Sequence, residues 1–428
     1  METSKVTLNL LRRRLKKQKR RTFLMFIVGL LLGGTIAFNI YYWYPWLKNE
    51  FSLPVINQMP TKNDKNITKE SKSTESSTQY TTETTIAKEN NLITPRIDGN
   101  DFTQASPIYK DLNKQLEQTI QQYKPSGTIL AIKNNQIVLL NNFGKASDFS
   151  NKPIESTYMI ASVQKFITSI LIMKLIDEQK ISLDTSLASF YPEIPNSNNI
   201  TIDQMLSMTS GLTLKEKSNK VKNKEDSIDY AIKNVVYEPI TKWKYSDINF
   251  FLLSAIVEKI THTSYEDYFK ETIKSPLQLE HTGFYDDITE GTHLIPSYNE
   301  EQDGKLSTEP VKIPEYAYIN ELGTGNMYIS ALDFLTIIQA TIDGKLTSYE
   351  TLQQTMQRKP APYPYDYKAG FYDKLDHYYA HGIFRKYEPT TLFNKDASTA
   401  VVFLSNTFTE DKSNPQLTKD LYQILTQQ

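Results

Sequence analysis

The stretch "YMIASVQKFITSILIMKLIDEQKISLD" (residues 158–184) places a serine, Ser162, and a lysine, Lys165, at the front of a long apolar helical pattern. Residues three apart on a helix lie on one face, so the hydroxyl and the amine are expected to be stacked. Serine is a poor nucleophile without a neighbouring base. Burial disfavours a charged amine, so an inward-pointing Lys165 would have a lowered pKa and would accept the serine proton. The free N–H groups at the helix N-terminus would then stabilise an oxyanion.

The serine–lysine spacing alone is a weak signal, because S-x-x-K occurs by chance on many solvated helix faces. Three further stretches follow it in order: "ITIDQMLSMTSGL" (200–212), "WKYSDINFFLLSAIVEKIT" (243–261) and "ELGTGNMYISALDFLTII" (321–338). Together the four resemble the serine β-lactamase and penicillin-binding-protein superfamily. The branch they resemble is class C-like, with D-alanyl carboxypeptidases, esterases and teichoic-acid D-alanyl esterases. The likeness runs from about residue 110 to the C-terminus, although Met208 stands where that family often has histidine.

The resemblance assigns roles to residues of this chain. Ser162 would be the nucleophile, Lys165 its base partner, and Tyr245 the phenol of the family's second motif, Y-x-N. The third position of that motif is Asp247, and a carboxylate there would hold Lys165 charged and shift proton transfer to Tyr245. Gly325 belongs to the glycine-rich segment that the resemblance places beside the active site.

The third family motif, K-T-G or H-x-G, is altered in this chain. An alignment without a gap puts Ala380 at the cationic position, followed by His381 and Gly382, so that the N–H of Ile383 would be the second oxyanion donor. A one-residue gap instead puts His381 at the cationic position and Ile383 in place of the glycine. We prefer the ungapped alignment because it keeps the glycine. Either alignment weakens the group that would pair with a substrate carboxylate, and this favours an ester substrate.

The element pattern predicts an α+β fold of the β-lactamase type over residues 101–428. Residues 127–147 read as two strands around an Asn-Asn turn, and "TAVVFLSN" (399–406) reads as a late strand. Helices are expected at 106–123 and 414–427, and two more are separated by a break near residues 261–263. We therefore expect one antiparallel sheet completed by both ends of the domain, with a helical subdomain inserted.

The first hundred residues have a different character. Residues 1–21 hold a basic block and predict a cytoplasmic tail. Residues 22–46 carry an uncharged run and an aromatic belt, and predict one transmembrane anchor, with a cleaved signal peptide as the alternative. Residues 47–100 are rich in Ser, Thr, Lys and Glu, and predict a disordered linker. Either interpretation of the anchor puts the remaining chain outside the cell.

Composition excludes several classes of site. Residues 1–50 carry ten Lys/Arg and two Asp/Glu; since the whole chain has a net charge of −1, the rest carries about −9, which argues against nucleic acid as a partner. The chain has no cysteine, so it has no thiolate zinc site. Its five histidines show no metal-ligand spacing, and there is no G-x-S-x-G elbow. We expect neither a metal nor a cofactor.

The sequence thus predicts a membrane-anchored, extracellular serine hydrolase. It would act through an acyl-enzyme on D-alanyl esters or peptides of the cell envelope, teichoic acid or peptidoglycan stem peptide, and the resemblance implies a Gram-positive bacterium. Two alternatives remain open at this stage. One is a catalytically inactive module that binds wall polymer or a partner protein, and the other is a β-lactamase.

Overall fold

The computed structural model describes residues 92–97, 107–240, 243–301, 305–356, 365–408, 410–411 and 413–427. All of them belong to one compact unit, Ile86–Gln428. The predicted tail (1–21), anchor (22–46) and most of the linker (47–100) lie outside the described residues and stay predictions. Within the described ranges, no helix has the length and apolar character needed to cross a membrane.

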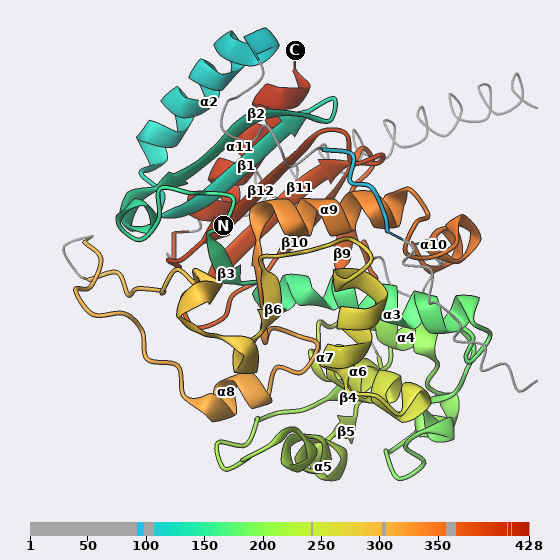
Figure 1. The fold of residues 1–428 in the computed structure, drawn as a ribbon. Helices are drawn as coiled ribbons and strands as arrows, with labels where there is room; N and C mark the ends of the chain where they lie inside the picture. Colours follow the sequence, from blue (N-terminus) through green and yellow to red (C-terminus); the bar gives the residue numbers. More distant parts are fainter. Residues whose placement is uncertain are drawn as a thin grey trace, which may run out of the picture. The chain divides into compact units, whose positions relative to one another are not determined.

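A seven-stranded antiparallel sheet runs through this unit in the order β2-β1-β12-β11-β10-β9-β8 (Figure 1). Strand β1, near the start of the domain, pairs with β12, near its end, in the register Gly127↔Ser405 to Ile132↔Ala400. Both ends of the domain therefore complete one sheet, and the α+β prediction is confirmed. The strands are β1 Gly127–Lys133, β2 Gln136–Phe143, β8 Tyr367–Lys368, β9 Phe371–Asp373, β10 His377–His381, β11 Glu388–Asn394 and β12 Ala400–Ser405.

The hairpin between β1 and β2 forms at the predicted Asn-Asn turn. Asn134 and Asn135 have φ values of 51° and 61°. Two consecutive left-handed residues are the requirement of the type I′ turn, and asparagine adopts this conformation more readily than most residues do. The turn therefore fixes the register of the two strands from local sequence.

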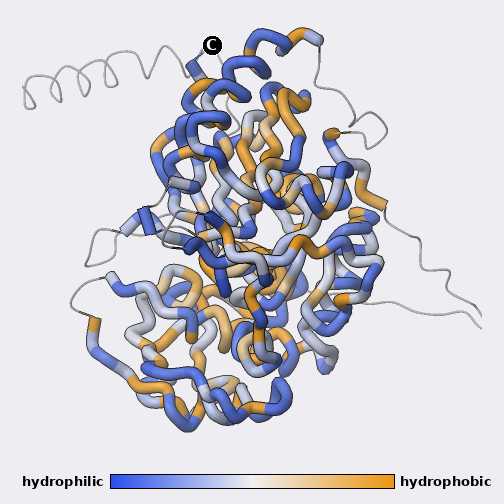
Figure 2. The backbone as a smooth tube through the Cα atoms, turned by 90° about the vertical axis from the view of Figure 1, so that its left-hand side faces the viewer, coloured by the Kyte–Doolittle hydropathy of each residue, from blue (hydrophilic) through white to orange (hydrophobic). Residues whose placement is uncertain are grey.

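Both faces of the sheet are covered, so strands β1 and β12 are buried along almost their whole length. Ile129 and Ala131 of β1 pack with helices α2 (Lys110–Tyr123) and α11 (Ser413–Thr426). The alternate residues Leu130 and Ile132 pack toward α3 and α9 on the opposite face. In Figure 2, apolar segments occupy the middle of this unit and hydrophilic ones surround them.

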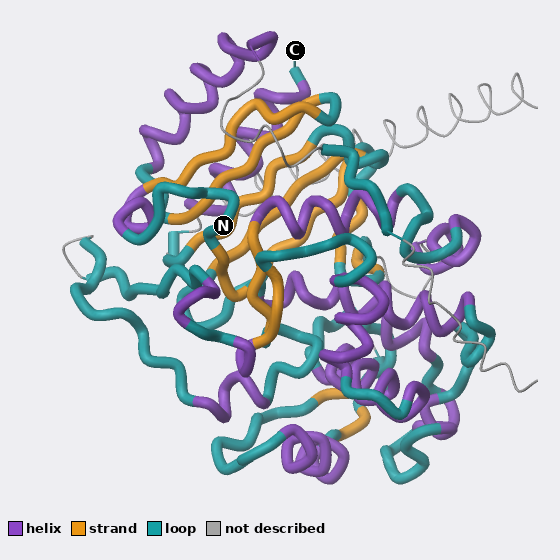
Figure 3. Tube along the Cα trace, viewed as in Figure 1, coloured by secondary structure: helices purple, strands orange, loops and turns teal. Residues whose placement is uncertain are grey.

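The inserted helices gather beside the sheet and form the second part of the core (Figure 3). Helix α3 (Lys165–Asp177) has ten buried residues of thirteen, because it is apolar on all sides and neighbouring elements surround it. Helix α6 (Ile248–Thr261) ends at His262, which has φ 54°, and α7 follows, so the predicted break is confirmed. The remaining elements are α4 Ile202–Leu206, α5 Lys224–Asn234, α7 Tyr265–Phe269, α8 Glu315–Ile319, α9 Ala331–Ile342, α10 Tyr349–Met356, and strands β3 Thr157–Met159, β4 Leu212–Thr213, β5 Val236–Tyr237, β6 Thr282–Phe284 and β7 Met327–Ser330.

Residues 92–97, at the end of the predicted linker, rest against the domain. Arg96 donates from Nε to the Asp343 carboxylate at 3.0 Å and from Nη1 to the carbonyl of Asp396 at 2.6 Å. The N–H of Ile93 donates to the carbonyl of Pro276 at 2.8 Å. This short stretch is therefore held at defined points on the domain.

Helix α11 offers a direct test of how much the sheet depends on its last helix. Leu421 is fully buried between α11 and the sheet. We expect Leu421→Ala to lower the free energy of unfolding by about 2–5 kcal/mol, because it leaves a cavity in this core layer. Urea unfolding followed by circular dichroism measures the change. Gln423→Ala, on the exposed side of the same helix, is the control, and an equal loss in both variants would contradict the assignment of the buried face.

Candidate active site

Ser162 and Lys165 lie where a short 3-10 turn, Ala161–Gln164, leads into α3. Lys165 Nζ donates to Ser162 Oγ at 2.9 Å, and the lysine side chain is fully buried. The residue before the serine, Ala161, has φ 50°, a left-handed conformation that costs free energy for a residue with a Cβ. The predicted stacking of hydroxyl and amine is therefore present, and the serine is presented by a strained turn of the kind found at functional sites.

Tyr245 and Asp247 reach the same point from the segment just before α6, with Asp247 directly ahead of its first residue. Lys165 Nζ lies 2.8 Å from Asp247 Oδ1 and 5.2 Å from the centre of the Tyr245 ring. The Tyr245 hydroxyl lies close enough to Lys165 and to Ser162 for both to lower its pKa, although burial raises the pKa by more. The two predicted motifs thus converge on one ammonium group. Asp247 Oδ1 is buried and accepts no well-aligned hydrogen bond from the described residues, so its contact with Lys165 is an ion pair.

The charges of this cluster set the pKa directions. Burial lowers the pKa of Lys165, but Asp247 and Tyr245 together raise it by a larger amount, so the net shift is upward. Burial raises the pKa of Tyr245 more than the nearby ammonium lowers it. Burial also raises the pKa of Asp247, yet Lys165 and Lys217 bring it below its usual value. The lowered pKa expected from burial alone is therefore wrong, and the raised pKa agrees with the other expectation, that a carboxylate at 247 holds Lys165 charged.

The third motif reaches the nucleophile through its glycine. A Cβ placed on Gly382 would lie 2.7 Å from the Ser162 nitrogen, so only a glycine lets the strand end approach this closely. The N–H of Ile383, just beyond, donates to none of the described residues. Ala380, at the cationic position of the ungapped alignment, is buried in the core on the α3 side. The backbone donors of Ser162 and Ile383 are thus available for an oxyanion.

The His381 side chain does not lie beside these two backbone donors. Successive side chains on a strand point to opposite faces, and His381 stacks on Tyr379, which packs on the α11 side of the sheet. His381 Nε2 lies 2.9 Å from Oε1 of the buried Glu388, whose other oxygen accepts from Asn414 at 2.7 Å. The expectation that His381 lines the site is therefore corrected: the side chain belongs to a polar network beneath α11.

Two charged residues that sequence reasoning did not select also face the site. Lys217 Nζ lies 2.6 Å from Glu321 Oε1 and 3.9 Å from Asp247 Oδ2. Gly325 lies beside them as expected, since a Cβ there would be 3.4 Å from Ala161 Cα and 3.4 Å from Glu321 Oε2. Lys217 sits in a lysine-rich loop without a motif, so its sequence gives no signal. Glu321 directly precedes the glycine-rich segment, and that position was the available signal.

Aromatic side chains surround Tyr245. Its ring centre lies 6.4 Å from that of Trp243 and 5.7 Å from that of Tyr367, and Tyr372 packs on Tyr367 at 5.0 Å. Trp243 donates from Nε1 to the carbonyl of Ser207 at 3.0 Å, which fixes the indole. These rings exclude water from one side of the phenol, and this burial is what raises its pKa.

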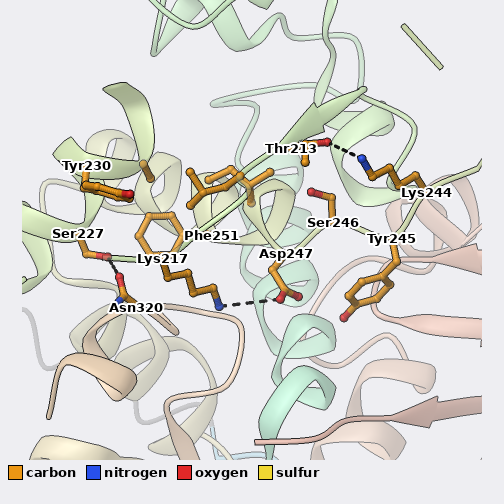
Figure 4. Close-up of a pocket in the computed structure, with 13 residues that line it drawn as sticks. Thr213, Lys217, Ser227, Tyr230, Lys244, Tyr245, Ser246, Asp247, Phe251 and Asn320 are labelled. Atoms are coloured by element: carbon orange, nitrogen blue, oxygen red, sulfur yellow. Dashed lines mark hydrogen bonds and ion pairs between the residues drawn. The ribbon is translucent and has the colours of Figure 1, made fainter. Parts of the chain in front are cut away.

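A cavity of about 210 Å³ opens beside Tyr245 and Asp247 (Figure 4). Tyr230 and Phe251 line one part of it, and Lys217 extends across it toward Asp247. Among the described residues, no group of three or more His, Asp or Glu side chains is arranged to hold a metal ion. The charged side chains that line the cavity are Lys217, Lys244 and Asp247.

Comparison with known sequences gives a consistent pattern. A family model described as Beta-lactamase matches residues 111–424. The putative penicillin-binding protein PbpX of Bacillus subtilis (strain 168) is 28% identical over 322 residues, which cover 74% of this chain and 80% of that protein. The teichoic acid D-alanine hydrolase of Staphylococcus aureus is 27% identical over 283 residues, covering 64% of this chain and 68% of the relative.

Solved structures share the fold. FmtA from Staphylococcus aureus superposes with a TM-score of 0.66 and 22% identity, over 77% of this chain and 92% of that one. The D-amino acid amidase from Ochrobactrum anthropi SV3 superposes with a TM-score of 0.63 and 17% identity, over 74% and 98% respectively. At these identities the two structures show a common fold.

The close approach of Gly382 to the nucleophile can be tested by adding one methyl group. Gly382→Ala would push the strand end away from Ser162 and displace the N–H of Ile383. We expect the rate of covalent labelling by a fluorophosphonate to fall by about 10²–10³-fold, the effect of losing one oxyanion donor. Gly291→Ala is the control, because a Cβ at Gly291 meets only one atom, at 3.9 Å. Unchanged labelling of folded Gly382→Ala protein would show that this backbone is not part of the reactive site.

The role of Asp247 can be tested by pH. Asp247 raises the pKa of Lys165, so the free amine forms only at high pH; Asp247→Asn removes this charge and leaves burial, which lowers the pKa. Because the relay needs the protonated amine, we expect labelling to fall at alkaline pH, and we expect this fall to move down by at least about one pH unit in Asp247→Asn. Asp229→Asn, whose side chain is 71% exposed, is the control. A profile that does not move, or that moves upward, would contradict the assigned charge state of Lys165.

Proposed function

This chain belongs to the beta-lactamase family, whose model matches residues 111–424, and we propose that it is a serine hydrolase that forms an acyl-enzyme on Ser162. The observation that carries the proposal is the hydrogen bond from Lys165 Nζ to Ser162 Oγ at 2.9 Å, with the ring of Tyr245 centred 5.2 Å from the same Nζ. A nucleophile, a cation and a proton-carrying phenol therefore meet at one point, beside two available backbone N–H groups.

The charge state favours a proton relay in which Lys165 stays protonated. As Ser162 Oγ bonds to the carbonyl carbon, its proton passes to the Tyr245 oxygen, and the proton of Tyr245 passes to the leaving alkoxide. The bond from the carbonyl carbon to the leaving oxygen then breaks, and an alcohol departs. Water enters by the reverse relay and releases the acid. The ammonium of Lys165 stabilises the charge that develops on Oγ and on the phenol oxygen.

We infer that the substrate is a D-alanyl ester on a cell-envelope polymer. Penicillins and peptidyl-D-alanine substrates end in a carboxylate, whereas an ester of D-alanine on a polyol has none at that position. The residue aligned with the family's cationic position is Ala380, which is buried and uncharged. The Staphylococcus aureus relative named teichoic acid D-alanine hydrolase supports the same choice.

We propose further that this domain works outside the cell on a membrane tether. The basic block in residues 1–21 and the uncharged, aromatic-flanked run at 22–46 support a single pass with the N-terminus in the cytoplasm. The polar composition of residues 47–100 supports a linker that gives the domain reach toward the wall polymer. The substrate would then lie within the range of the tether.

Product release and covalent labelling together test the proposal. We expect the full-length protein to release D-alanine from D-alanylated lipoteichoic acid, and Ser162→Ala to lose this activity by more than about 10³-fold because it removes the nucleophile. Fluorophosphonate labelling should be strong, and labelling by fluorescent penicillin weak, in the wild-type protein alone. Circular dichroism of Ser162→Ala checks that the variant is folded.

Other outcomes would contradict this function in distinct ways. Strong labelling by penicillin together with its hydrolysis would indicate a β-lactamase. Labelling by both reagents without release of D-alanine from the polymer would favour a peptide substrate. The absence of both labelling and release would favour an inactive binding module.

A further inference from the structure

The carboxylates of Asp247 and Glu321 lie near the turn that carries Ser162, and the ammonium of Lys217 lies between them. Lys217 Nζ is 2.6 Å from Glu321 Oε1 and 3.9 Å from Asp247 Oδ2 (Figure 4 shows Lys217 reaching toward Asp247). The lysine is 35% exposed and comes from the loop after β4, whereas Lys165, on the other side of Asp247, is fully buried. Asp247 thus has a buried ammonium, that of Lys165, at Oδ1 and a partly exposed one, that of Lys217, near Oδ2.

Glu321 is held in place and open toward the nucleophile. Thr324, which is buried, donates from Oγ1 to Glu321 Oε2 at 2.8 Å and fixes the carboxylate. A Cβ on Gly325 would lie 3.4 Å from both that oxygen and Ala161 Cα. Since glycine has no side chain, nothing from residue 325 separates the Glu321 carboxylate from the turn that carries Ser162.

This geometry matches the charge on an aminoacyl ester. The α-ammonium nitrogen of such an ester is about 2.5 Å from the carbonyl carbon that Ser162 attacks, as follows from standard bond lengths and angles. The ammonium must therefore lie close to the serine, on a side of the site where a negative group can meet it. Asp247 and Glu321 supply two such groups, and in this structure the ammonium of Lys217 lies between these two carboxylates.

We propose that Glu321 and Asp247 form the recognition site for the α-ammonium of the aminoacyl ester, and that Lys217 is an internal stand-in which the substrate displaces. The exchange keeps the local charge constant, because one ammonium replaces another between the same carboxylates. An ester whose amine is acylated has no charge to replace Lys217, so it binds without this contribution. The inference rests on the proposed function and names the part of the substrate that the site selects.

The test compares two esters in the full-length protein. One is D-alanine methyl ester, with its free ammonium, and the other is N-acetyl-D-alanine methyl ester, which is neutral. We expect Glu321→Gln to lower kcat/KM for the free-amine ester by about 10-fold or more, the weight of a lost charged contact, and to leave the N-acetyl ester within about twofold. Lys217→Met should act in the opposite direction and lower KM for the free-amine ester.

Matched controls come from the second ion pair at this cavity. Lys244 Nζ lies 2.8 Å from Glu238 Oε2, and neither residue contacts Asp247 or Glu321 in any described interaction. Glu238→Gln and Lys244→Met should therefore keep the wild-type ratio between the two esters. The rate of fluorophosphonate labelling is measured for Glu321→Gln as well, and its effect on each ester is compared with that rate.

A readout without turnover separates this inference from the proposed function. D-Alanine amide should slow fluorophosphonate labelling of the wild-type protein, and N-acetyl-D-alanine amide should not. Equal effects of Glu321→Gln on both esters, or equal protection by both amides, would overturn the ammonium site while leaving the hydrolase intact. Failure to cleave either ester despite rapid labelling would instead overturn the ester hydrolase function, and this inference with it.

Discussion

The ammonium of Lys165 is the constraint on which the site depends. A lysine with no exposed surface must be paired, because a lone buried charge is strongly destabilising. Its partners come from two chain segments: Ser162 lies one turn before it, and Asp247 opens α6. Compensating this charge therefore also fixes the distance between α3 and α6, and this distance places Tyr245 at the nucleophile. Stability and reactivity thus derive from the same contact.

The aspartate at 247 changes the chemistry that this arrangement performs. With the family's usual asparagine, burial would be the largest influence on Lys165 and would favour a neutral amine. With the carboxylate, the pKa of Lys165 is raised, and the lysine acts as a fixed positive charge rather than as a base. Proton movement is then left to Tyr245, whose aromatic surroundings keep it protonated at rest. Such a relay beside a permanent cation can deliver a proton to the leaving group while Lys165 keeps its charge.

The sequence predicted what is local or periodic. The Ser162–Lys165 spacing, the Asn134–Asn135 turn and the strands at both ends of the domain all follow from patterns within short windows, and the structure has them where expected. For the pKa of Lys165 the sequence predicted two opposing influences, burial and the carboxylate at 247, and only the distances in the structure decide that the pKa is raised. Lys217 was missed because a loop lysine has no pattern, and its position depends on Glu321, about a hundred residues away. His381 was misplaced because one residue along a strand reverses the face to which a side chain points.

The pairing of β1 with β12 has a consequence for the timing of maturation. Residues nearly 280 positions apart must meet before this sheet can close, so the domain has a high contact order and its nucleation cannot be local. Strand β10, which leads to Gly382 beside Ser162, joins this sheet through β11, the neighbour of β12. The backbone beside Ser162 is therefore completed only when these late strands have paired, so the reactive arrangement is a property of the closed sheet and not of the Ser162–Lys165 segment alone.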